Sequence, residues 1–250
     1  MRDEALKIEI SRVHQDNYSA YGLRKLWCAL KREGIDIARC TTQRLMAELG
    51  IRGVRRGKTY VTTTIANELA ERPKDLVNRN FVSDGPNRLW VADITYVKTK
   101  IGWAYAAFIT DVFSRTIVGW KVSASLKSSL ATDALEMAIA QRVVRPGELT
   151  HHADRGVQYL SVKYSQRLID AGITASVGST GDSYDNALAE TVNGLYKAEM
   201  VNPHGQFSGT DELEWATLAY IDWFNNRRLH GSIGMISPAE FENNYHSQPA

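Results

Sequence analysis

Three consecutive apolar stretches, rich in β-branched and aromatic residues, place the strongest constraint on the fold of this 250-residue chain. They run from Leu89 to Val97, from Trp103 to Phe113 and from Thr116 to Val122. Such residues favour strands, and spacers this short join antiparallel neighbours. The sequence therefore predicts an antiparallel three-stranded unit that begins near Leu89.

Helical and extended patterns alternate after this unit. The predicted elements are a helix over Ser128 to Arg142, a strand over Glu148 to Asp154, a helix through Tyr164 and Leu168 that ends at Gly172, a strand over Ile173 to Val177, and helices over Asp185 to Met200 and Glu212 to Arg227. This order predicts an α/β fold, a mixed five-stranded sheet flanked by helices. It is the topology of ribonuclease-H-like domains.

The N-terminal residues have helical patterns instead. Apolar residues from Leu23 to Leu30 recur at helical spacing, and Gly34 follows as a stop signal. Thr41 or Thr42 is the predicted N-cap of a second helix that ends at Gly50. The opening residues supply a third helix. Three short helices predict a small all-α helix-turn-helix domain or, alternatively, a plain helical bundle.

Positive charge is concentrated in the same region. Residues 1–80 carry 16 Lys and Arg against 10 Asp and Glu, whereas residues 81–250 carry 14 against 18. A basic segment beside an acidic body is typical of polyanion binding, although a solvated surface explains the charge as well. The helix predicted to begin at Thr41 or Thr42 and to end at Gly50 would be the second helix of the helix-turn-helix and would read DNA. The predicted DNA contacts in this region are Arg24, Lys25, Arg39, Thr42, Gln43, Arg44, Arg55, Arg56 and Lys58.

Composition excludes several classes of protein. With 44% hydrophobic and 23% charged residues, the chain resembles neither disordered nor fibrous proteins. Cys28 and Cys40 are too few for a disulfide framework or a four-cysteine zinc site. No apolar run has the length of a signal-peptide core or a membrane span. We therefore expect a cytoplasmic protein that does not enter a membrane.

Three acidic residues lie where carboxylates are uncommon. Asp93 is inside the first predicted strand, Asp154 ends the fourth, and Glu190 is on the helix after the fifth. Taken singly, each is better explained as a capping or salt-bridged carboxylate. In the predicted topology, however, the first and fourth strands are neighbours and the helix can cross their ends. The three side chains can then converge on a divalent cation.

The spacing of these acids resembles a known signature. Asp154 and Glu190 have 35 residues between them, as in the D,D(35)E signature of retroviral-integrase-type transposases. The flanking residues resemble a narrower family, the integrase-core transposases encoded by the second reading frame (OrfB) of two-frame bacterial insertion sequences. The matching stretches are Tyr21–Lys25, Ala38–Thr41, Asn87–Val97, Asp111–Arg115, His151–Tyr159, Gly181–Glu190 and Arg228–Phe241.

The resemblance implies both a division of the chain and a metal site. It implies a helix-turn-helix DNA-binding domain at 1–52, a basic linker at 53–86 and a ribonuclease-H-like catalytic core with C-terminal helices at 87–245. It also implies that Asp93 bridges two Mg²⁺ ions, for which Mn²⁺ can substitute, while Asp154 and Glu190 complete one ion each. Paired Mg²⁺ ions suit phosphodiester chemistry, because they activate the attacking oxygen and stabilise the leaving one.

The implied activity is that of a DNA transposase, which binds insertion-sequence ends and catalyses DNA cleavage and strand transfer. The implied partners are double-stranded DNA (terminal repeats and target), further copies of the chain and the first-frame product (OrfA). The implied location is the bacterial cytoplasm, at the nucleoid when the protein is bound to DNA. Two alternatives stay open: a non-catalytic DNA-binding regulator or fragment of a fused two-frame transposase, and a ribonuclease-H-like nuclease without strand transfer.

Residues near the acids have alternative roles. Lys197 lies two helical turns after Glu190, and the resemblance implies that it approaches DNA, whereas a solvent-exposed lysine is the alternative. Asp185 and Asn186 can cap the helix or position Glu190, and capping is the preferred prediction.

Basic side chains elsewhere are also ambiguous. His151 and His152 are predicted to pack in the strand or to support metal ligands. Arg227, Arg228 and His230 either contact DNA phosphate or brace the fold.

Overall fold

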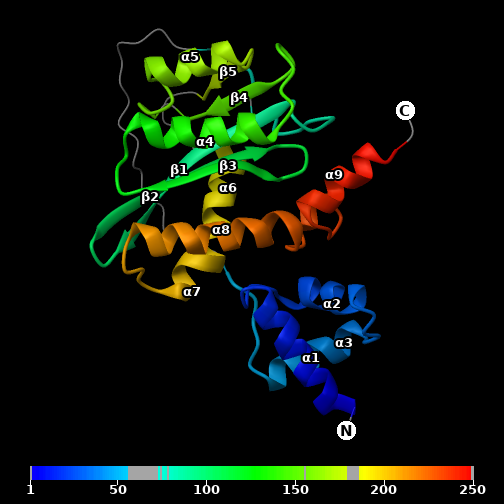
Figure 1. Ribbon diagram of the computed structural model, residues 1–250. Coiled ribbons are helices and arrows are strands. Elements are labelled where there is room, and N and C mark those ends of the chain that lie inside the picture. The colour runs from blue at the N-terminus through cyan, green and yellow to red at the C-terminus, as the bar shows by residue number, and fades with distance from the viewer. Residues whose placement is uncertain are drawn as a thin grey trace.

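The computed structural model describes residues 2–55, 73, 75–77, 79–154, 156–178 and 186–248. Three helices form a group at the N-terminal end, the sheet lies at the other end, and α8 runs between them (Figure 1). The elements are α1 (Arg2–Asp16), α2 (Leu23–Arg32), α3 (Arg39–Glu48), β1 (Leu89–Thr99), β2 (Gly102–Asp111), β3 (Ile117–Ser123), α4 (Ser128–Gln141), β4 (Thr150–Ala153), α5 (Val162–Asp170), β5 (Thr174–Val177), α6 (Ala187–Tyr196), η2 (Lys197–Val201), α7 (Asn202–His204), α8 (Thr210–Asn226), η3 (Gly231–Ile233) and α9 (Pro238–His246). Within those ranges no helix combines the length and the apolar character needed to cross a membrane.

The body is built on a mixed five-stranded sheet with the strand order β3-β2-β1-β4-β5. β2 is antiparallel to both β1 and β3, so the predicted three-stranded unit is confirmed. β4 pairs in parallel with β1 and with β5. The α/β architecture is therefore the predicted one.

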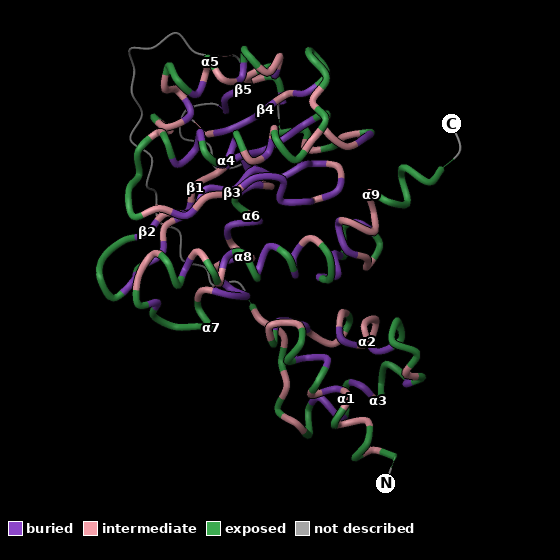
Figure 2. Tube along the Cα trace, viewed as in Figure 1, coloured by how far each residue is buried: buried purple, intermediate pink, exposed green. Residues whose placement is uncertain are grey.

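Helices cover both faces of the sheet. α4 and α5 pack on one face over a cluster that includes Trp90 and Ile109. α6 and α8 cover the other face around Phe108 and Tyr196. Gly119 lets α4 approach β3 closely, because a Cβ atom there would lie only 2.2 Å from a carbonyl oxygen of α4. The strands are consequently buried over most of their length (Figure 2).

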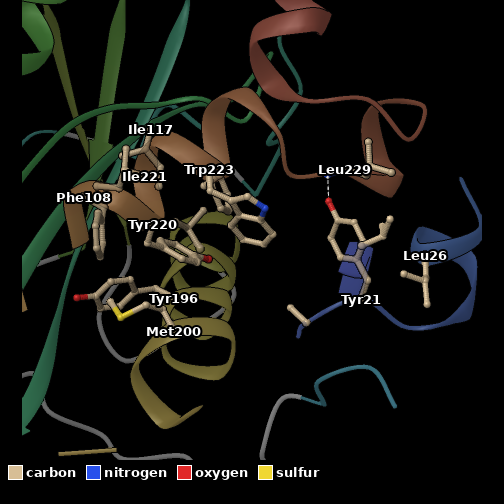
Figure 3. Close-up of a cluster of buried hydrophobic side chains, with 14 of the residues drawn as sticks. Tyr21, Leu26, Phe108, Ile117, Tyr196, Met200, Tyr220, Ile221, Trp223 and Leu229 are labelled. Carbon is tan, nitrogen blue, oxygen red and sulfur yellow. Dashed lines mark hydrogen bonds between the residues drawn. The ribbon is translucent and has the colours of Figure 1, made fainter. Parts of the chain in front are cut away.

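The N-terminal helices share a hydrophobic core with the body. The buried residues of α1 to α3 belong to the same cluster as those of α6 and α8 (Figure 3). At the junction, the backbone N–H of Leu229 donates to the hydroxyl of Tyr21 at 2.7 Å. The indole N–H of Trp223 donates to Asn17 at 3.0 Å, and its ring lies 4.8 Å from that of Tyr18. These contacts join the N-terminal helices to the body.

The predicted cap of α3 is wrong. The helix begins at Arg39, and Ala38 occupies its N-cap position without a side-chain hydrogen bond. Thr42 is fully buried inside the helix, and its hydroxyl donates to the carbonyl oxygen of Ala38 at 3.1 Å. The start of α3 is therefore fixed by its packing against the other two helices and not by a capping hydroxyl.

The long helix predicted over 185–200 is interrupted. α6 ends at Tyr196, and the chain continues as a π-helix, η2, over Lys197–Val201. Single-turn π segments are rare and occur frequently at functional sites. Here the π segment turns Glu199 into the interior, where it is buried.

Candidate active site

Asp93 and Asp154 meet where β4 ends and β1 continues. The last paired residues of these parallel strands are Ala92 and Ala153, and each aspartate is the next residue along its strand. The carboxyl ends of parallel strands in open α/β sheets are common binding sites. Asp93 thus lies inside β1, whereas Asp154 begins the loop after β4.

Glu190 belongs to the first turn of α6, which is anchored beside Asp93. Asn186, at the N-cap position, donates its side-chain N–H to the carbonyl oxygen of Ala92 at 2.9 Å. The predicted capping role of Asn186 is wrong, because its side chain makes no cap hydrogen bond. Its amide instead ties the start of α6 to β1. Asp185 lies outside the described residues.

The pKa of Asp93 is raised to about 8. Burial is the largest cause, and the nearby charge of Asp154 is the second. Glu190 raises the pKa further, while hydrogen bonds from Ile94 and Asn193 to the charged form oppose the shift. The three carboxylates are therefore close enough to repel one another.

The pKa values of the other two acids are raised as well. Burial raises the pKa of Asp154, against the opposing effects of the Gly156 N–H, which donates at 2.9 Å, and of His152. Burial and the charge of Asp154 raise the pKa of Glu190. Each acid thus holds its negative charge less readily than a carboxylate in water.

Two residues beside Asp93 were missed by sequence reasoning. Asn193 donates to Oδ2 of Asp93 at 2.8 Å. Its position three residues after Glu190 on one helix face could have indicated this contact. Tyr159 is buried, and its hydroxyl has no hydrogen-bond partner among the described residues. Burial and then the charge of Asp93 raise the pKa of Tyr159 well above its ordinary value.

Lys197 lies close to the same edge. Its Nζ is 4.1 Å from the centroid of the Tyr96 ring. Burial lowers the pKa of Lys197, and the charge of Asp93 opposes that shift. The side chain is therefore half-buried rather than freely solvated, and its contact with DNA stays a prediction.

The acids match the donor chemistry that Mg²⁺ prefers. Among the residues that the structure describes, no three His, Cys, Asp or Glu side chains are arranged closely enough to hold a metal ion. Yet the set Asp93, Asp154 and Glu190 offers only carboxylate oxygens, the ligands Mg²⁺ prefers. Their raised pKa values mark a site where a cation would relieve repulsion. The donor chemistry of these three acids suits Mg²⁺, but their side chains as placed do not form a metal-binding cluster.

The two histidines on β4 are packing residues in the structure. His151 is buried and its Nε2 lies 2.9 Å from the hydroxyl of Tyr164. Burial lowers the pKa of His151 to about 3. His152 is also buried, 2.9 Å from the hydroxyl of Ser176. These contacts support strand packing, and for His152 its effect on the pKa of Asp154 also agrees with the second predicted role, support of a metal ligand.

The helix predicted to read DNA is α3, and not all of its predicted DNA contacts are exposed. Thr42 is wrong as a DNA contact, because its side chain is buried in the core of the three helices. Gln43 and Arg44 are exposed. Arg44 forms ion pairs with Asp3 at 2.8 Å and Glu48 at 2.7 Å.

The remaining predicted DNA contacts lie mostly on the surface. Lys25 lies 5.4 Å from the centroid of the Tyr21 ring. Arg56 and Lys58 are outside the described residues. The exposed members are Arg24, Arg39, Arg55 and Arg227.

Arg228 and His230 brace the fold. Arg228 is buried and donates to Glu199 through Nε at 2.8 Å. The His230 Nδ1 is 3.2 Å from Nη1 of Arg228, and burial lowers the pKa of His230 to about 2. Neither side chain is available to a DNA phosphate, whereas Arg227 is exposed and pairs with Asp222 at 2.8 Å.

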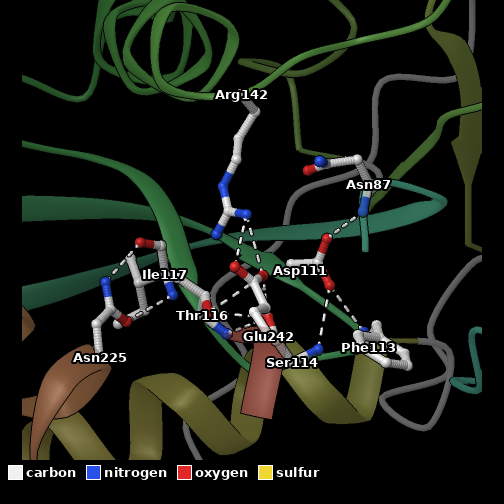
Figure 4. A network of polar contacts seen from close by, with 9 residues as sticks. All are labelled: Asn87, Asp111, Phe113, Ser114, Thr116, Ile117, Arg142, Asn225 and Glu242. Atoms are coloured by element: carbon white, nitrogen blue, oxygen red, sulfur yellow. Dashed lines mark hydrogen bonds and ion pairs between the residues drawn. The ribbon is translucent and has the colours of Figure 1, made fainter. Parts of the chain in front are cut away.

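The turn after β2 is held by a buried aspartate, Asp111. Asp111 accepts hydrogen bonds from the backbone N–H groups of Asn87 at 2.7 Å, Phe113 at 2.9 Å and Ser114 at 3.2 Å (Figure 4). Next to it, Glu242 of α9 accepts from Arg142 at 2.8 Å. Asp111, which belongs to the matching stretch Asp111–Arg115, therefore has a structural role, since it lies away from Asp93 and fixes the turn.

Comparisons with known protein families and relatives agree with this architecture. The family described as "Integrase core domain" matches residues 83–183 and 171–238, and the family described as "HTH-like domain" matches residues 1–59. The transposase for insertion sequence element IS629 from Shigella sonnei is 52% identical over 98% of this chain and 81% of the relative. A protein assigned as a transposase for insertion sequence element IS986/IS6110 from Mycobacterium tuberculosis is 50% identical over 99% of this chain and 90% of the relative.

Solved structures share the fold at low sequence identity. A chain of the simian T-cell lymphotropic virus intasome, solved in complex with PP2A regulatory subunit B56 gamma, aligns with a TM-score of 0.54 at 18% identity. The alignment covers 96% of this chain and 76% of the viral one. The HTLV-2 integrase catalytic core domain, solved in complex with magnesium, aligns with a TM-score of 0.51 at 18% identity, covering 64% of this chain and 99% of that domain.

Proposed function

Because this chain belongs to the insertion-sequence transposases with an integrase core, we propose that it cleaves and joins DNA strands at Asp93, Asp154 and Glu190. The observation that carries this assignment is the position of the acids: Asp93 and Asp154 each follow the last paired residue of two neighbouring parallel strands, and Asn186 ties the start of α6, which carries Glu190, to β1. The raised pKa of Asp93 agrees with a functional carboxylate.

Mg²⁺ is the proposed cofactor, as two ions per site, with Mn²⁺ as a substitute. When bound, the ions would activate the attacking oxygen and stabilise the charge on the leaving oxygen. The chain's own residues set the geometry. Asn193 holds the Asp93 carboxylate through its hydrogen bond, and Asn186 fixes the first turn of α6, which carries Glu190, against β1.

Double-stranded DNA is the proposed substrate, both as the terminal repeats of the element and as target. The N-terminal helices would bind the repeats through α3, where Gln43 and Arg44 are exposed. We also propose that further copies of this chain assemble on the DNA, that the first-frame product (OrfA) is a partner, and that the bound protein is at the nucleoid. The other proposed phosphate contacts are Arg24, Lys25, Arg39, Arg55, Arg56, Lys58, Lys197 and Arg227.

A cleavage and joining assay tests this proposal. The full chain would be incubated with the DNA that flanks its gene, in Mg²⁺ or Mn²⁺. We expect Asp154→Asn to lose both cleavage and joining, while Asp170→Asn, an exposed aspartate at the end of α5, keeps them. Full activity of a folded Asp154→Asn protein would refute the site assignment. Wild-type protein that binds the ends but never cuts them would favour a DNA-binding regulator.

A further inference from the structure

The β1–β2 hairpin extends past the proposed active site. β4 ends opposite Ala92, but β1 continues to Thr99 before the chain turns into β2. The hairpin end therefore projects beyond the edge where Asp93 and Asp154 meet, and its tip is exposed (Figure 2).

The two faces of this projecting hairpin differ in burial. Successive side chains of a strand point to opposite faces, and Tyr96 and Lys98 pair with Tyr105 and Trp103. These four residues, which we call the hairpin face, are half-buried or exposed. The opposite face is buried and includes Val97. One side of the hairpin packs on the helical layer, and the other remains open.

The hairpin face combines aromatic rings with positive charge. The Tyr96 and Trp103 rings meet edge to face, with centroids 5.4 Å apart and planes inclined at 77°. Lys197 lies over the Tyr96 ring, 4.1 Å from its centroid. Trp103 is 51% exposed, and its strand partner Lys98 is also exposed. Large aromatic surfaces left open to water mark binding sites, and lysines beside them favour an anionic ligand.

We infer that the hairpin face binds an unpaired nucleobase of the DNA strand that the proposed site cleaves, with the base stacked on Trp103 and Lys197 beside the backbone. This inference rests on the proposed function and adds the place where a separated strand passes. Aromatic rings combined with basic side chains are the usual means of holding single-stranded nucleic acid, because every base offers a face for stacking.

The charge around the hairpin face favours DNA over a second protein surface. Lys98, Lys100 and Lys197 all lie on or beside the hairpin, and the acidic neighbour Glu212 accepts a hydrogen bond from the Ser208 hydroxyl at 2.6 Å and interacts with Lys100. Trp215 on α8 offers the contrast. It is 72% exposed, but it follows Glu214 in a helix whose first turn contains Asp211 and Glu212.

Trp215 therefore provides a matched control for Trp103. Binding would be measured by fluorescence anisotropy without a divalent metal, using the flanking DNA as a blunt duplex and as a duplex with a three-nucleotide single-stranded extension. We expect Trp103→Ala to weaken binding of the extended duplex about tenfold and to leave the blunt duplex unchanged. Trp103→Phe should stay within about twofold of wild type, and Trp215→Ala should change neither affinity.

A second measurement reports base stacking directly. A 2-aminopurine base in the extension should lose fluorescence on binding to wild-type protein, because stacking quenches it, and should keep it with Trp103→Ala. Equal weakening of both duplexes by Trp103→Ala, an unquenched probe with wild-type protein, or a change of oligomeric state in place of DNA affinity would each overturn the inference. Since no cleavage is measured, failure here differs from failure of the active site, which the Asp154→Asn assay reports.

Discussion

Glu199 and the group of acids around Asp93 differ in the charges that surround them. Glu199 is 6% exposed, and Arg228 and Tyr220 both donate hydrogen bonds to its Oε2, at 2.8 Å and 3.1 Å. Asp93, by contrast, has two further acids as neighbours, and its pKa rises to about 8. The Glu199 charge is matched within the fold, whereas the charge at the sheet edge is not. A buried charge that is left unmatched marks a site for a ligand rather than a support for the fold.

The largest effect expected from this contrast is on activity. Replacing Asp93 with Asn should lower Mg²⁺-dependent DNA cleavage about a thousandfold or more, because bound metal supplies several kcal/mol of transition-state stabilisation. The same change should raise the melting temperature of the metal-free protein at pH 8, since it removes a repelled charge. Cleavage assays and calorimetry in EDTA would measure both effects.

Asp133 of α4 is an exposed aspartate and serves as the control for this experiment. Asp133→Asn should leave cleavage and melting temperature near their wild-type values. A lower melting temperature for metal-free Asp93→Asn would show that the carboxylate stabilises the fold, and the contrast with Glu199 would fail.

The second effect concerns the buried ion pair between Arg228 and Glu199. Burial works to lower the pKa of Arg228, but its hydrogen bonds to Glu199 and the nearby negative charges, that of Glu199 first, together raise it. Arg228→Met leaves Glu199 buried without its partner and should cost about 3–5 kcal/mol of unfolding free energy. Arg227→Met, the neighbouring exposed position, should cost about 0–1 kcal/mol. Urea denaturation of the two variants would measure the difference.

A double variant sharpens this prediction. Glu199→Leu combined with Arg228→Met replaces the pair by apolar side chains and should recover most of the lost stability, because no unpaired charge stays buried. If the double variant is as unstable as Arg228→Met, the loss comes from packing at the junction and not from the uncompensated charge.

Buried histidines give the third prediction, a pH dependence of stability. Burial lowers the pKa of His151 to about 3 and that of His230 to about 2. Below pH 6.5 each of these histidines binds a proton in the unfolded chain but not in the folded one, so its contribution to stability is lost as the pH falls from about 6.5 toward its folded pKa. Each histidine can contribute up to about 1.4 kcal/mol per pH unit. His151→Phe should flatten the profile below pH 6.5, and His246→Phe, an exposed position, should not.

Local patterns in the sequence were sufficient to predict a mixed five-stranded sheet flanked by helices. The three antiparallel strands follow from runs of β-branched residues and short spacers, and the alternation after them predicted two further strands with helices between them. Asp93 could be identified because an acid inside an apolar strand is uncommon. The contact of Asn193 could have been inferred from its place three residues after Glu190, whereas the turn at Asp111 depends on Asn87, a contact between distant segments that no local pattern records.

Other features depend on packing that only the folded chain supplies. The π-helix η2 has no signal in residue spacing, and it directs Glu199 toward an arginine 29 residues away. Thr42 has a residue type that suits both an N-cap and a DNA contact, yet the rotation of α3 against its neighbours buries it. Asn186 occupies the N-cap position but bonds the sheet instead. The predictions for Thr42 and Asn186 failed because each of these polar side chains had two possible partners.

The smallest expected effect concerns an exposed charge, a third kind of environment. Arg44 pairs with Asp3 and Glu48 on the surface, and such pairs contribute little to stability. Arg44→Ala should therefore leave unfolding nearly unchanged but weaken binding to terminal-repeat DNA about threefold to tenfold, because a base or phosphate contact outweighs the pairs it displaces.

Arg12→Ala on α1, which removes comparable surface pairs, should not change DNA affinity. Anisotropy titrations at two salt concentrations would separate the alternatives: loss of a phosphate contact lowers the salt dependence and weakens binding to all sequences equally. Equal affinity for repeat and random DNA in wild type and variant alike would contradict a reading role for α3.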